Sequence, residues 1–327
     1  GYVGLVTGVC FADLGNTVHC VDTDVHKIKK LNNSFVPIFE PGLEELVKKC
    51  YKDKRLIFTT DLKKSVTRSD IIFVCVGTPS VKISNSANLK YVFKVARDIR
   101  KYIKKFKIVI IKSTVPVTTG DKVEEIINSK VRRKLFEVIS NPEFLREGEA
   151  IRDFKYPDRI IIGTENKKVT KILANLYEPI IRKGAIYFKT SRRSAELIKY
   201  ASNAFLATKI SFINELANLC EKIGINTEDI AIGMGLDKRI GSRFLRIGPA
   251  YGGSCFPKDT RALVSIGKKF KANMSIVRSV IKSNENRRSL LTKRIYEIMS
   301  NKLKNKIITF LGVTFKANTD DMRMSSS

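Results

Sequence analysis

The segment Ile71-Ile72-Phe73-Val74-Cys75-Val76-Gly77-Thr78-Pro79 decides the fold class predicted for this chain. Its apolar run predicts a buried strand, and the Gly-Thr-Pro that follows predicts a loop at the carboxyl end of that strand. Similar runs occur at residues 17–21, 108–111, 136–140 and 159–163, with helical stretches such as 43–52 and 89–106 between them. Strands that alternate with helices predict an α/β fold with a doubly wound parallel sheet. Ligands of such sheets bind beyond the carboxyl ends of the strands, where these polar loops lie.

A long apolar helix is predicted next, over residues 194–222, with a length of roughly 40 Å. It carries more apolar side chains than one face of a surface helix holds. We therefore expect it to form a spine between two domains and part of a dimer interface. Shorter helices follow to about residue 300, and residues 306–313 predict a fresh strand that opens a second nucleotide-binding domain. The predicted domains are residues 1–192, 193–300 and 301–327.

The amino-acid composition argues against a membrane protein and against a zinc protein. Hydrophobic residues make up 43% of the 327 residues, no apolar run reaches the roughly 18 residues of a membrane span, and the first residues do not form a signal peptide. These features predict a soluble, cytoplasmic protein with no membrane partner. Six cysteines without a C-x-x-C pair, together with only two histidines, argue against a zinc site, so we expect no metal.

The net charge of +29 raises the question of nucleic-acid binding. The lysines are spread over the whole chain, which favours solvated surface faces over a nucleic-acid site. We therefore expect no nucleic-acid partner, and the charge would instead help to attract an anionic substrate. A contiguous basic stripe would favour the alternative, a basic binding protein that has kept only the fold.

Gly1-Tyr2-Val3-Gly4, followed by an apolar helix, is similar to the second half of the G-x-G-x-x-G dinucleotide fingerprint and so predicts a Rossmann-like sheet. Gly1 would let the backbone approach a pyrophosphate, and Gly4 would let the helix pack closely on the sheet. Asp22 ends a predicted strand about 20 residues later, where an acid binds a ribose hydroxyl and favours NAD over NADP. The alternative for Asp22 is a helix cap. The first strand of the motif is absent, so two other strands are expected to lack a neighbour in the sheet.

The segment Gly248-Pro249-Ala250-Tyr251-Gly252-Gly253-Ser254-Cys255-Phe256-Pro257-Lys258-Asp259 carries the strongest chemical signal. Glycines before a cysteine predict a tight loop that exposes the sulfur, and a neighbouring cation such as Lys258 raises the thiolate fraction. For a lone cysteine, a buried thiol in a glycine-rich turn would be the better interpretation. Here the whole string favours Cys255 as a catalytic nucleophile.

Three further groups could assist such a cysteine, although each has a simpler explanation. Lys199 and Asn203, four apart on the long helix, could stabilise an oxyanion, or could be a solvated lysine and a surface amide. Glu143 and Glu147 could activate water, or could belong to a charged helical turn. Thr114 follows a predicted strand and could hold a water molecule or a cofactor group, or could be a turn hydroxyl.

Taken together, these segments resemble the UDP-glucose/GDP-mannose dehydrogenase family, and within it the UDP-glucose 6-dehydrogenases. The resemblance covers essentially the entire chain, and the strings GGSCFPKD at residues 252–259 and NPEFLREG at residues 141–148 are its most specific parts. The Phe256-Pro257 pair resembles the UDP-glucose branch more than the GDP-mannose branch, which tends to have Leu-Pro there. The other matching segments are residues 1–5, 40–43, 76–79, 113–117, 195–215, 237–241 and 315–325.

The resemblance implies an enzyme of nucleotide-sugar metabolism and polysaccharide biosynthesis that converts UDP-glucose to UDP-glucuronate by two successive NAD-dependent oxidations, through a thiohemiacetal and a thioester on Cys255. It implies that Lys199 and Asn203 stabilise oxyanions, and that water hydrolyses the thioester with help from Glu147, Thr114 and Asp259. The residues implied to contact NAD are Gly1, Gly4, Asp22, Lys27, Thr78, Thr114, Glu147, Lys258 and Arg323. The residues implied to contact the sugar nucleotide are Glu143, Phe144, Leu145, Arg146, Glu147, Lys199, Asn203, Arg239, Phe244, Leu245, Arg246, Ile247, Gly248, Gly252, Phe315 and Lys316. A homodimer is implied as well, with Arg239 reaching the substrate of the neighbouring subunit.

Three positions depart from the family pattern. Thr118 and Ala250 stand where the family usually has glycine, and Thr314 stands where it usually has alanine. We expect Ala250 to matter most, because a glycine at that position could adopt a positive φ. The chain is also expected to be truncated at both ends relative to the family. A dehydrogenase for UDP-N-acetylmannosamine or GDP-mannose and an inactive remnant of the family are the alternatives to a UDP-glucose 6-dehydrogenase.

Overall fold

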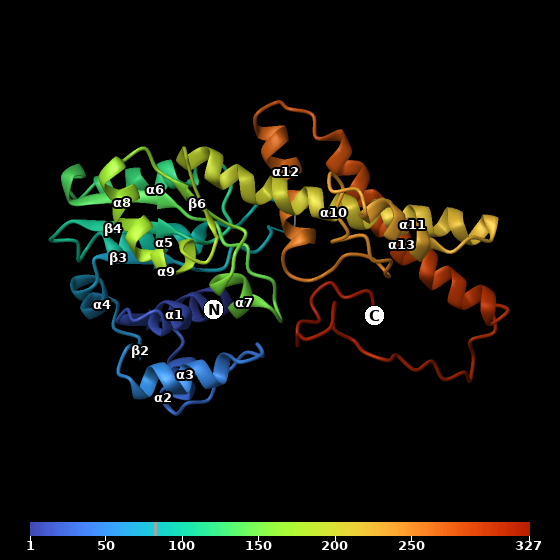
Figure 1. Cartoon of the computed structure of the whole chain (residues 1–327), viewed down its shortest axis with the longest axis horizontal. Coiled ribbons are helices and arrows are strands. Elements are labelled where there is room, and N and C mark those ends of the chain that lie inside the picture. Colours follow the sequence, from blue (N-terminus) through green and yellow to red (C-terminus); the bar gives the residue numbers. More distant parts are fainter. Residues whose placement is uncertain (82–83) are drawn as a thin grey trace. The chain divides into compact units, whose positions relative to one another are not determined.

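The computed structural model describes residues 1–81 and 84–327. They divide into two compact units (Figure 1). Unit 1 comprises Gly1–Pro79, Ala87–Lys199 and Asn318–Asp320, and unit 2 comprises Ser80–Ser86, Tyr200–Ala317 and Asp321–Ser327. The division falls within helix α10 (Arg192–Ile223), a little beyond the boundary predicted at residue 192.

Unit 1 is built on two sheets. A two-stranded parallel sheet pairs β1 (Val18–Val21) with β2 (Leu56–Thr59). The larger sheet has the order β3-β4-β5-β6-β7, and the bounds of its strands are Ile71–Val74, Lys107–Ile111, Phe136–Ser140, Arg159–Gly163 and Ile186–Thr190. Its neighbours are parallel except β5 and β6, which pair antiparallel. β1 and β3 lie in different sheets, which agrees with the expectation that two strands lack a neighbour.

At strand β4, both faces of the larger sheet are buried, as is typical of sheets covered by helices on each side. In β4, Ile108 and Ile110 belong to one apolar core, and Val109 and Ile111 belong to the other. Each of these four side chains is at most 2% exposed. Because successive side chains of a strand point to opposite faces, a continuous apolar run is what a strand without a solvent face requires.

Helix α1 (Tyr2–Asp13) packs between the larger sheet and helix α3 (Leu43–Lys52) (Figure 1). Near its carboxyl end, the ring of Phe11 lies 5.2 Å from the ring of Phe73 on β3. Near its amino end, a Cβ on Gly4 would lie 3.1 Å from the Cβ of Cys75. Gly4 therefore permits the close helix–sheet packing predicted for it.

The remaining helices of unit 1 connect or cover the strands. They are α2 (Val25–Asn32), α4 (Leu62–Arg68), α5 (Lys90–Ile99), α6 (Thr119–Asn128), α7 (Ala150–Lys155), α8 (Lys167–Leu176) and α9 (Glu178–Ile181), together with a short 3-10 helix at Arg133–Leu135. Helices α5 and α6 pack on each other, and their apolar side chains belong to the second of the two cores.

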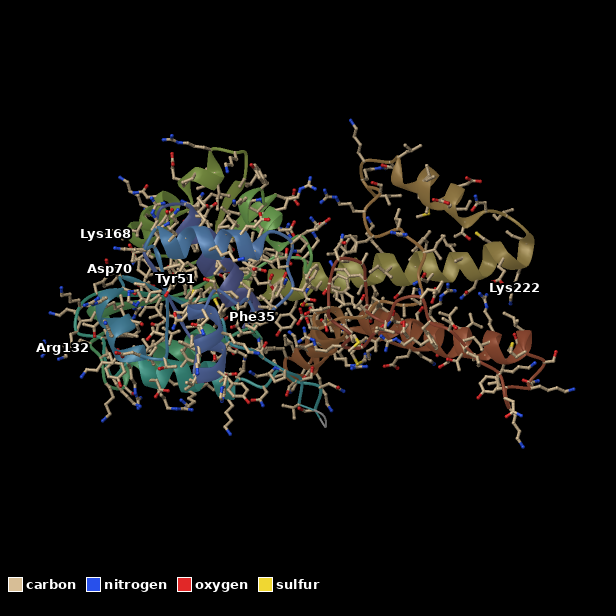
Figure 2. All side chains as sticks on the ribbon, turned by 90° about the horizontal axis from the view of Figure 1, so that it is seen from below. Phe35, Tyr51, Asp70, Arg132, Lys168 and Lys222 are labelled. Carbon is tan, nitrogen blue, oxygen red and sulfur yellow. The ribbon has the colours of Figure 1, made fainter. Side chains whose placement is uncertain are left out.

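Unit 2 is helical. It contains residues 200–223 of α10 and the helices α11 (Thr227–Gly235), α12 (Phe256–Lys269) and α13 (Ser275–Ile298). Helices α10 and α13 lie side by side, with Ala207 and Val280 in one buried cluster (Figures 1 and 2). A second buried cluster joins α10 to α12 through Ala204 and Leu263.

Three parts of the secondary structure differ from the prediction. Strands β2 and β7 were not predicted, and the helix predicted over residues 89–106 ends at Ile99. Residues 306–313, predicted as a strand, have no regular structure, and their Ile307 and Leu311 are 94% and 97% exposed. None of the described strands pairs with this segment. The prediction was wrong because an apolar run forms a stable strand only where a sheet is present to receive it.

Charged side chains project from the surface of each unit. In Figure 2, Arg132 and Lys168 extend outward from unit 1, and Lys222 extends outward from the unit 2 part of α10. This arrangement agrees with solvated lysine and arginine faces, and the absence of a nucleic-acid partner stays a prediction. Among the described residues, no helix combines the length and the apolar character needed to cross a membrane.

Candidate active site

The amino end of α1 has the features of a dinucleotide phosphate site. Its N-cap is Gly1, and among the described residues no side chain caps the helix and no acid lies in its first turn. The N–H groups at such a helix end attract anions. The carboxylate of Asp22, after β1, lies 3.3 Å from the Gly1 amino group. The residues predicted for pyrophosphate and ribose therefore lie together.

Two other predicted cofactor contacts have local partners. Lys27 forms an ion pair with Asp24 at 3.5 Å, and Asp24 caps α2 by accepting the backbone N–H of Lys27. Thr78, in the loop after β3, is 7% exposed and donates its hydroxyl to the carbonyl oxygen of Thr114 at 2.8 Å. Thr78 thereby ties the loop after β3 to the loop after β4, at the sheet edge where ligands of this fold bind.

Glu143 and Lys199 form a buried ion pair. Glu143 Oε1 lies 3.3 Å from Lys199 Nζ, and the side chains are 6% and 5% exposed. Glu143 also accepts the backbone N–H of Leu145 at 2.6 Å, and the Lys199 ammonium lies 5.1 Å from the centre of the Phe144 ring. Lys199 is therefore not a solvated surface lysine. Buried charges of this kind persist only where they are paired and hydrogen-bonded.

The loop after β5 is not helical, so Glu143 and Glu147 do not share a helix face. Arg146 in this loop binds both oxygens of Asp153, at 2.9 and 2.6 Å, and pairs with Glu149 at 2.7 Å. Glu147 is half-buried. Burial raises the pKa of Tyr2, a hydrogen bond to Glu40 and the charge of Glu40 add to the rise, and the charge of Glu147 contributes least. The loop therefore holds Arg146 against Asp153 and Glu149, and a joint role of Glu143 and Glu147 stays a prediction.

Glu40 anchors the end of the same loop. Its side chain is 6% exposed and accepts the backbone N–H groups of Gly148 and Ala150, each at 2.7 Å. It also accepts the hydroxyl of Tyr2 at 2.5 Å. Three donors satisfy a carboxylate that would otherwise be costly to bury. The sequence marked Glu40 as part of a matching segment without assigning it a role.

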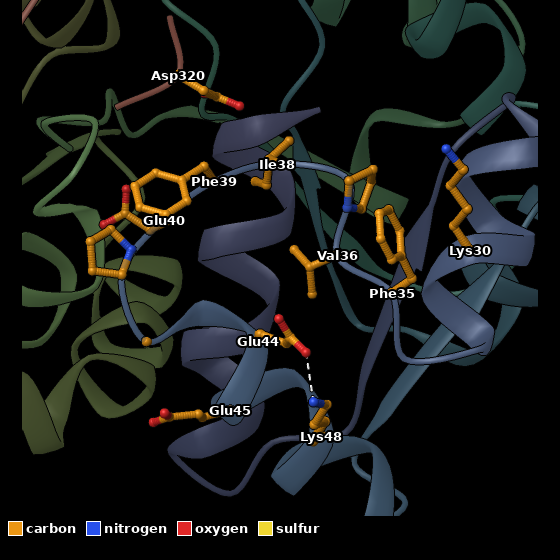
Figure 3. A pocket seen from close by; sticks show the side chains of 13 residues that line it. Lys30, Phe35, Val36, Ile38, Phe39, Glu40, Glu44, Glu45, Lys48 and Asp320 are labelled. Atoms are coloured by element: carbon orange, nitrogen blue, oxygen red, sulfur yellow. Dashed lines mark hydrogen bonds and ion pairs between the residues drawn. The ribbon is translucent and has the colours of Figure 1, made fainter. Parts of the chain in front are cut away.

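A cavity of about 800 Å³ lies in unit 1 beside α2 and α3 (Figure 3). Its walls include Phe35, Phe39 and Glu40, and Glu44 pairs with Lys48 on another wall at 2.6 Å. Its described lining contains none of the residues predicted to bind cofactor or substrate. This cavity is therefore not where the predicted catalytic and binding residues lie. Glu40 lines the cavity and also accepts hydrogen bonds from the loop after β5.

In unit 2, Cys255 is the N-cap residue of α12, so its sulfur lies near the positive end of a helix dipole. The side chain is partly exposed, and Ser254 Oγ lies 3.6 Å from its sulfur. Gly253, before it, has φ +76, and a Cβ there would lie 2.7 Å from the ring of Phe315. A residue with a side chain would be strained and would clash, so the tight glycine loop predicted before the cysteine depends on Gly253.

Asp259 lies one turn after Cys255 and is fully buried. Its Oδ2 accepts the side-chain amide of Asn203 at 2.6 Å, and its other oxygen pairs with the Lys258 ammonium. Asn203 is 5% exposed, so it is not a surface amide. Cys255 and Asp259, which were predicted from one motif, lie in and next to the first turn of α12, and Asp259 connects them to Asn203, which was predicted from the long helix.

The segment after Phe315 folds over the glycines that precede Cys255. Gly253 donates its N–H to the carbonyl oxygen of Arg323, and Phe315 donates its N–H to the carbonyl oxygen of Asp321, each at 3.0 Å. A Cβ on Gly252 would lie 2.5 Å from the carbonyl oxygen of Met324. The Arg323 guanidinium pairs with Asp321 at 2.7 Å. Phe315 and Arg323, predicted to contact substrate and NAD, therefore lie against the cysteine loop.

The other predicted substrate residues of unit 2 have different exposures. Leu245 is 3% exposed, and Gly248 donates its N–H to the side-chain oxygen of Asn214 at 2.9 Å. The side chain of Arg239 is 89% exposed and pairs with Asp237 at 2.6 Å. Its exposure is compatible with a contact to a neighbouring subunit, which stays a prediction.

The strain expected at Ala250 is found at Thr118 instead. Ala250 is not among the described residues with positive φ, whereas Thr118, the N-cap of α6, has φ +77. A side chain in this left-handed region costs about 1–2 kcal/mol. Ala250 was expected to be the strained position, and this expectation was wrong. Thr118 and Ala250 both stand where a glycine was expected, and the sequence does not show which of the two positions has a positive φ.

Two buried ionisable side chains near these loops were not predicted. Lys112 is 6% exposed and donates to the side-chain oxygen of Asn141 at 3.0 Å, and burial lowers its pKa to about 8. Glu196, near the start of α10, is 3% exposed and accepts two backbone N–H groups. One signal could have found Glu196: it precedes Lys199 by three residues, so both lie on one helix face.

Two family models match the chain. The NAD binding domain of the UDP-glucose/GDP-mannose dehydrogenase family matches residues 1–181, and the central domain of that family matches residues 193–286. A UDP-glucose 6-dehydrogenase of Rhizobium meliloti (strain 1021) is 50% identical over 327 residues, which is 99% of this chain and 75% of that protein. The solved structure of a UDP-glucose dehydrogenase from Pyrobaculum islandicum matches with a TM-score of 0.95 and 38% identity, over 100% of this chain and 75% of that chain. A UDP-D-ManNAc dehydrogenase from Pyrococcus horikoshii matches with a TM-score of 0.89 and 26% identity, over 100% of this chain and 77% of that chain.

Proposed function

Because the chain belongs to the UDP-glucose/GDP-mannose dehydrogenase family, we propose that it converts UDP-glucose to UDP-glucuronate by two successive NAD-dependent oxidations. The names of its relatives from Rhizobium meliloti and Pyrobaculum islandicum support this sugar nucleotide. The observation that carries the choice of reaction is Cys255, which caps α12 beside the buried Asp259–Asn203 pair. Oxidation of an alcohol to an acid passes through an aldehyde, and a cysteine can hold that aldehyde covalently.

NAD fits the residues at the amino end of α1, where the backbone of Gly1 is accessible, Gly4 packs on the sheet and Asp22 can receive ribose hydroxyls. Bound NAD supplies a hydride acceptor. We assign Lys27, Thr78, Thr114, Glu147, Lys258 and Arg323 to further contacts with it. The dinucleotide and the sugar nucleotide are both anionic, and the net charge of +29 favours their approach.

In the first oxidation, the terminal alcohol of the glucose loses its C–H hydrogen as a hydride and its O–H hydrogen as a proton. Negative charge gathers on the oxygen as the proton leaves. We assign its stabilisation to the Lys199 ammonium and the Asn203 amide, whose buried settings make charged and hydrogen-bonding groups more effective than they are in water.

In the second oxidation, the Cys255 thiol adds to the aldehyde: the sulfur forms a bond to the carbon, the C=O double bond becomes a C–O single bond, and the thiol proton ends on that oxygen, which gives a thiohemiacetal. Loss of a second hydride from the same carbon to the nicotinamide acceptor, and of the proton from the oxygen, leaves a thioester. Water then breaks the C–S bond, which restores the thiol and releases the acid. We assign Glu147, Thr114 and Asp259 to holding this water and receiving its proton. The substrate contacts follow the matching motifs: residues 143–147, 244–248, Gly252, Phe315 and Lys316.

A homodimer is part of the proposal. On the unit 2 part of α10, Phe205, Phe212 and Leu219 are 67%, 48% and 52% exposed. Their spacing of seven residues places them on one face of the helix. An apolar stripe of this kind is typical of a helix that packs against another chain. We propose that a second copy covers it and that Arg239 reaches the partner's substrate. The cytoplasmic location stays a prediction.

The covalent step is tested by replacing the nucleophile. Wild-type protein is expected to form two NADH for each UDP-glucose consumed and to release UDP-glucuronate, followed by absorbance and chromatography. Cys255→Ser is expected to form no net acid, because serine lacks the nucleophilicity of a thiolate. Cys220→Ser, which changes a buried cysteine of α10, is the control and is expected to form acid. Acid formation by Cys255→Ser at the wild-type rate would contradict the covalent mechanism.

The substrate is tested with the same assay. The structural similarity to the Pyrococcus horikoshii enzyme favours a UDP-N-acetylmannosamine dehydrogenase as the second candidate, and GDP-mannose is the third substrate to compare. Turnover of one of these two, with none of UDP-glucose, would reassign the substrate. Folded protein that forms no NADH from any of the three would identify the chain as an inactive remnant.

A further inference from the structure

Glu196 holds the turn that opens helix α6. Its Oε2 accepts the backbone N–H of Thr118 at 2.8 Å, and its Oε1 accepts that of Gly120 at 2.7 Å. The side chain is 3% exposed, and Ser140 Oγ lies 3.4 Å from Oε1. Among the described residues, Thr118 makes no capping bond of its own. Glu196 therefore supplies from α10 the cap and the negative charge that the first turn of α6 attracts.

The loop before this turn carries Thr114 and is fixed at its other end as well. Ser113 donates its hydroxyl to the carbonyl oxygen of Val76 at 2.7 Å, and Thr78 donates to the carbonyl oxygen of Thr114 at 2.8 Å. Thr114 thus lies between an anchor on the strand β3 side and the anchor that Glu196 provides. Release of either anchor would let Thr114 move.

Glu196 also shares a small cavity with Lys199. Thr114, Ser140 and Pro142 complete much of its lining, and its volume is about 10 Å³, close to the smallest space that holds a water molecule. All of these residues belong to unit 1. Glu196 and Lys199 therefore line a common space with room for about one water molecule.

The charged neighbours of Glu196 are Arg192 and Lys199 on α10 and Asp121 and Glu124 on α6. Arg192 is engaged by both acids of α6, at 2.6 Å from Asp121 and 2.5 Å from Glu124. Burial raises the pKa of Glu196 to about 7, against the two backbone hydrogen bonds, and the charge of Asp121 adds to the rise. The carboxyl group therefore changes its charge near neutral pH.

We propose that Glu196 is a positioning residue for the dehydrogenase reaction, whose ionised carboxylate fixes Thr114 through the turn at Thr118–Gly120 and faces Lys199 across the cavity. A protonated carboxyl group has one strong acceptor oxygen instead of two, so one of the two N–H groups loses its partner. This inference rests on the proposed function, because that function gives Thr114 and Lys199 their parts in the reaction.

The first test is the pH dependence of kcat/KM for NADH formation, from about pH 5 to about pH 9. The wild-type value is expected to rise with pH with a midpoint near 7, as Glu196 becomes ionised. Glu196→Gln cannot become ionised and accepts only one N–H. It is expected to lose this rise and to be about tenfold to a hundredfold slower at high pH, as displaced groups often are. An unchanged rise with the same midpoint in Glu196→Gln would overturn the proposal.

Two further variants separate positioning from general damage. Glu40→Gln changes another buried carboxylate that accepts two backbone N–H groups. It is expected to be less stable but to keep the rise near pH 7. Asp121→Asn removes a like charge and leaves Arg192 with one acidic partner, Glu124, instead of two, and both changes favour the ionised form of Glu196. It leaves the two backbone bonds in place, so it serves even where Glu196→Gln does not fold. Its midpoint is expected at lower pH than that of the wild type, and a midpoint at the same or higher pH would contradict the proposal.

A measurement that does not depend on catalytic activity tests the role of Glu196 separately from the proposed function. Hydrogen exchange of the peptide that contains Thr118 and Gly120, corrected for the intrinsic pH effect, is expected to be faster in Glu196→Gln than in the wild type or Glu40→Gln. Equal protection in all three proteins would show that Glu196 does not hold the turn. A folded wild type without activity would contradict the proposed function, and the exchange result would still decide whether Glu196 fixes the loop.

Discussion

Thr118 and Gly42 have nearly the same backbone conformation in different helices. Both are N-cap residues, with φ 77 and ψ 1 at Thr118 and φ 77 and ψ −3 at Gly42. Glycine adopts these angles freely, whereas a residue with a Cβ is strained by about 1–2 kcal/mol. Glu196 binds the N–H groups of Thr118 and Gly120 and so contributes to holding the strained turn. Glu196, to which the sequence analysis assigned no role, thus acts at Thr118, where this sequence is expected to depart from the family pattern.

Thr118→Gly is expected to raise the free energy of unfolding by about 0.5–1 kcal/mol. This is the relief of the left-handed strain less the extra entropy that glycine gives the unfolded chain. The bonds from Glu196 go to the backbone and are retained. The measurement is equilibrium unfolding in urea.

Gly42→Thr is the matched reverse change and is expected to lower stability. A Cβ there meets only a side-chain carbon at 3.8 Å, an ordinary contact, so strain and not a clash decides the sign. A Thr118→Gly variant that is less stable than the wild type would show that the threonine is compensated elsewhere.

The spacing of apolar residues in helix α10 predicted the bounds of the helix and part of its packing. Its apolar residues and its length were predicted closely, because a helix of this kind repeats every 3.6 residues along the sequence. The pattern also predicted more than one buried side. In unit 2, Ala204 and Ala207 are buried against other helices, whereas Phe205 and Phe212 remain 67% and 48% exposed. The exposed face is the one we assign to the homodimer.

Phe212→Asp is expected to convert the dimer to a monomer, because it would bury a carboxylate without a partner at the centre of the stripe. Light scattering coupled to size-exclusion chromatography gives the mass. Phe188→Asp is the control, since Phe188 is 47% exposed on β7 and lies outside the stripe. A dimer that persists in Phe212→Asp would place the interface elsewhere, and a monomeric wild type would contradict the homodimer.

Strands and site residues were predictable to different degrees for physical reasons. Strands β5 and β6 were predicted with their observed bounds, because each carries a buried apolar run, at residues 138–139 and 160–162. Strand β7 has exposed residues such as Ile186 and lacks that signature. Cys255 and Asp259 were found from one continuous motif. Glu196 was missed because its partners are backbone N–H groups distant in sequence, and backbone donors leave no mark on the residue types of a chain.

The net charge is a property of the whole molecule, and its distribution decides what it does. A charge of +29 attracts any polyanion, but strong nucleic-acid binding needs several cations placed along one surface. The lysines and arginines are spread along the whole sequence. Such a distribution is expected to accelerate the approach of small anions, and the absence of a nucleic-acid partner stays a prediction.

Salt is therefore expected to weaken the capture of substrate more than the chemistry. Raising the ionic strength from about 0.02 M to about 0.5 M shortens the screening length from about 20 Å to about 4 Å. The value of kcat/KM for UDP-glucose should fall several-fold, while kcat should change little because the buried pairs Glu143–Lys199 and Asp259–Asn203 are screened less. Binding of a fluorescent DNA duplex at about 0.15 M salt is the control and is expected to be no tighter than non-specific binding, about 10⁻⁶ M or weaker. Tighter duplex binding, with kcat/KM independent of salt, would show that the positive charge does not serve substrate capture and would favour a nucleic-acid partner.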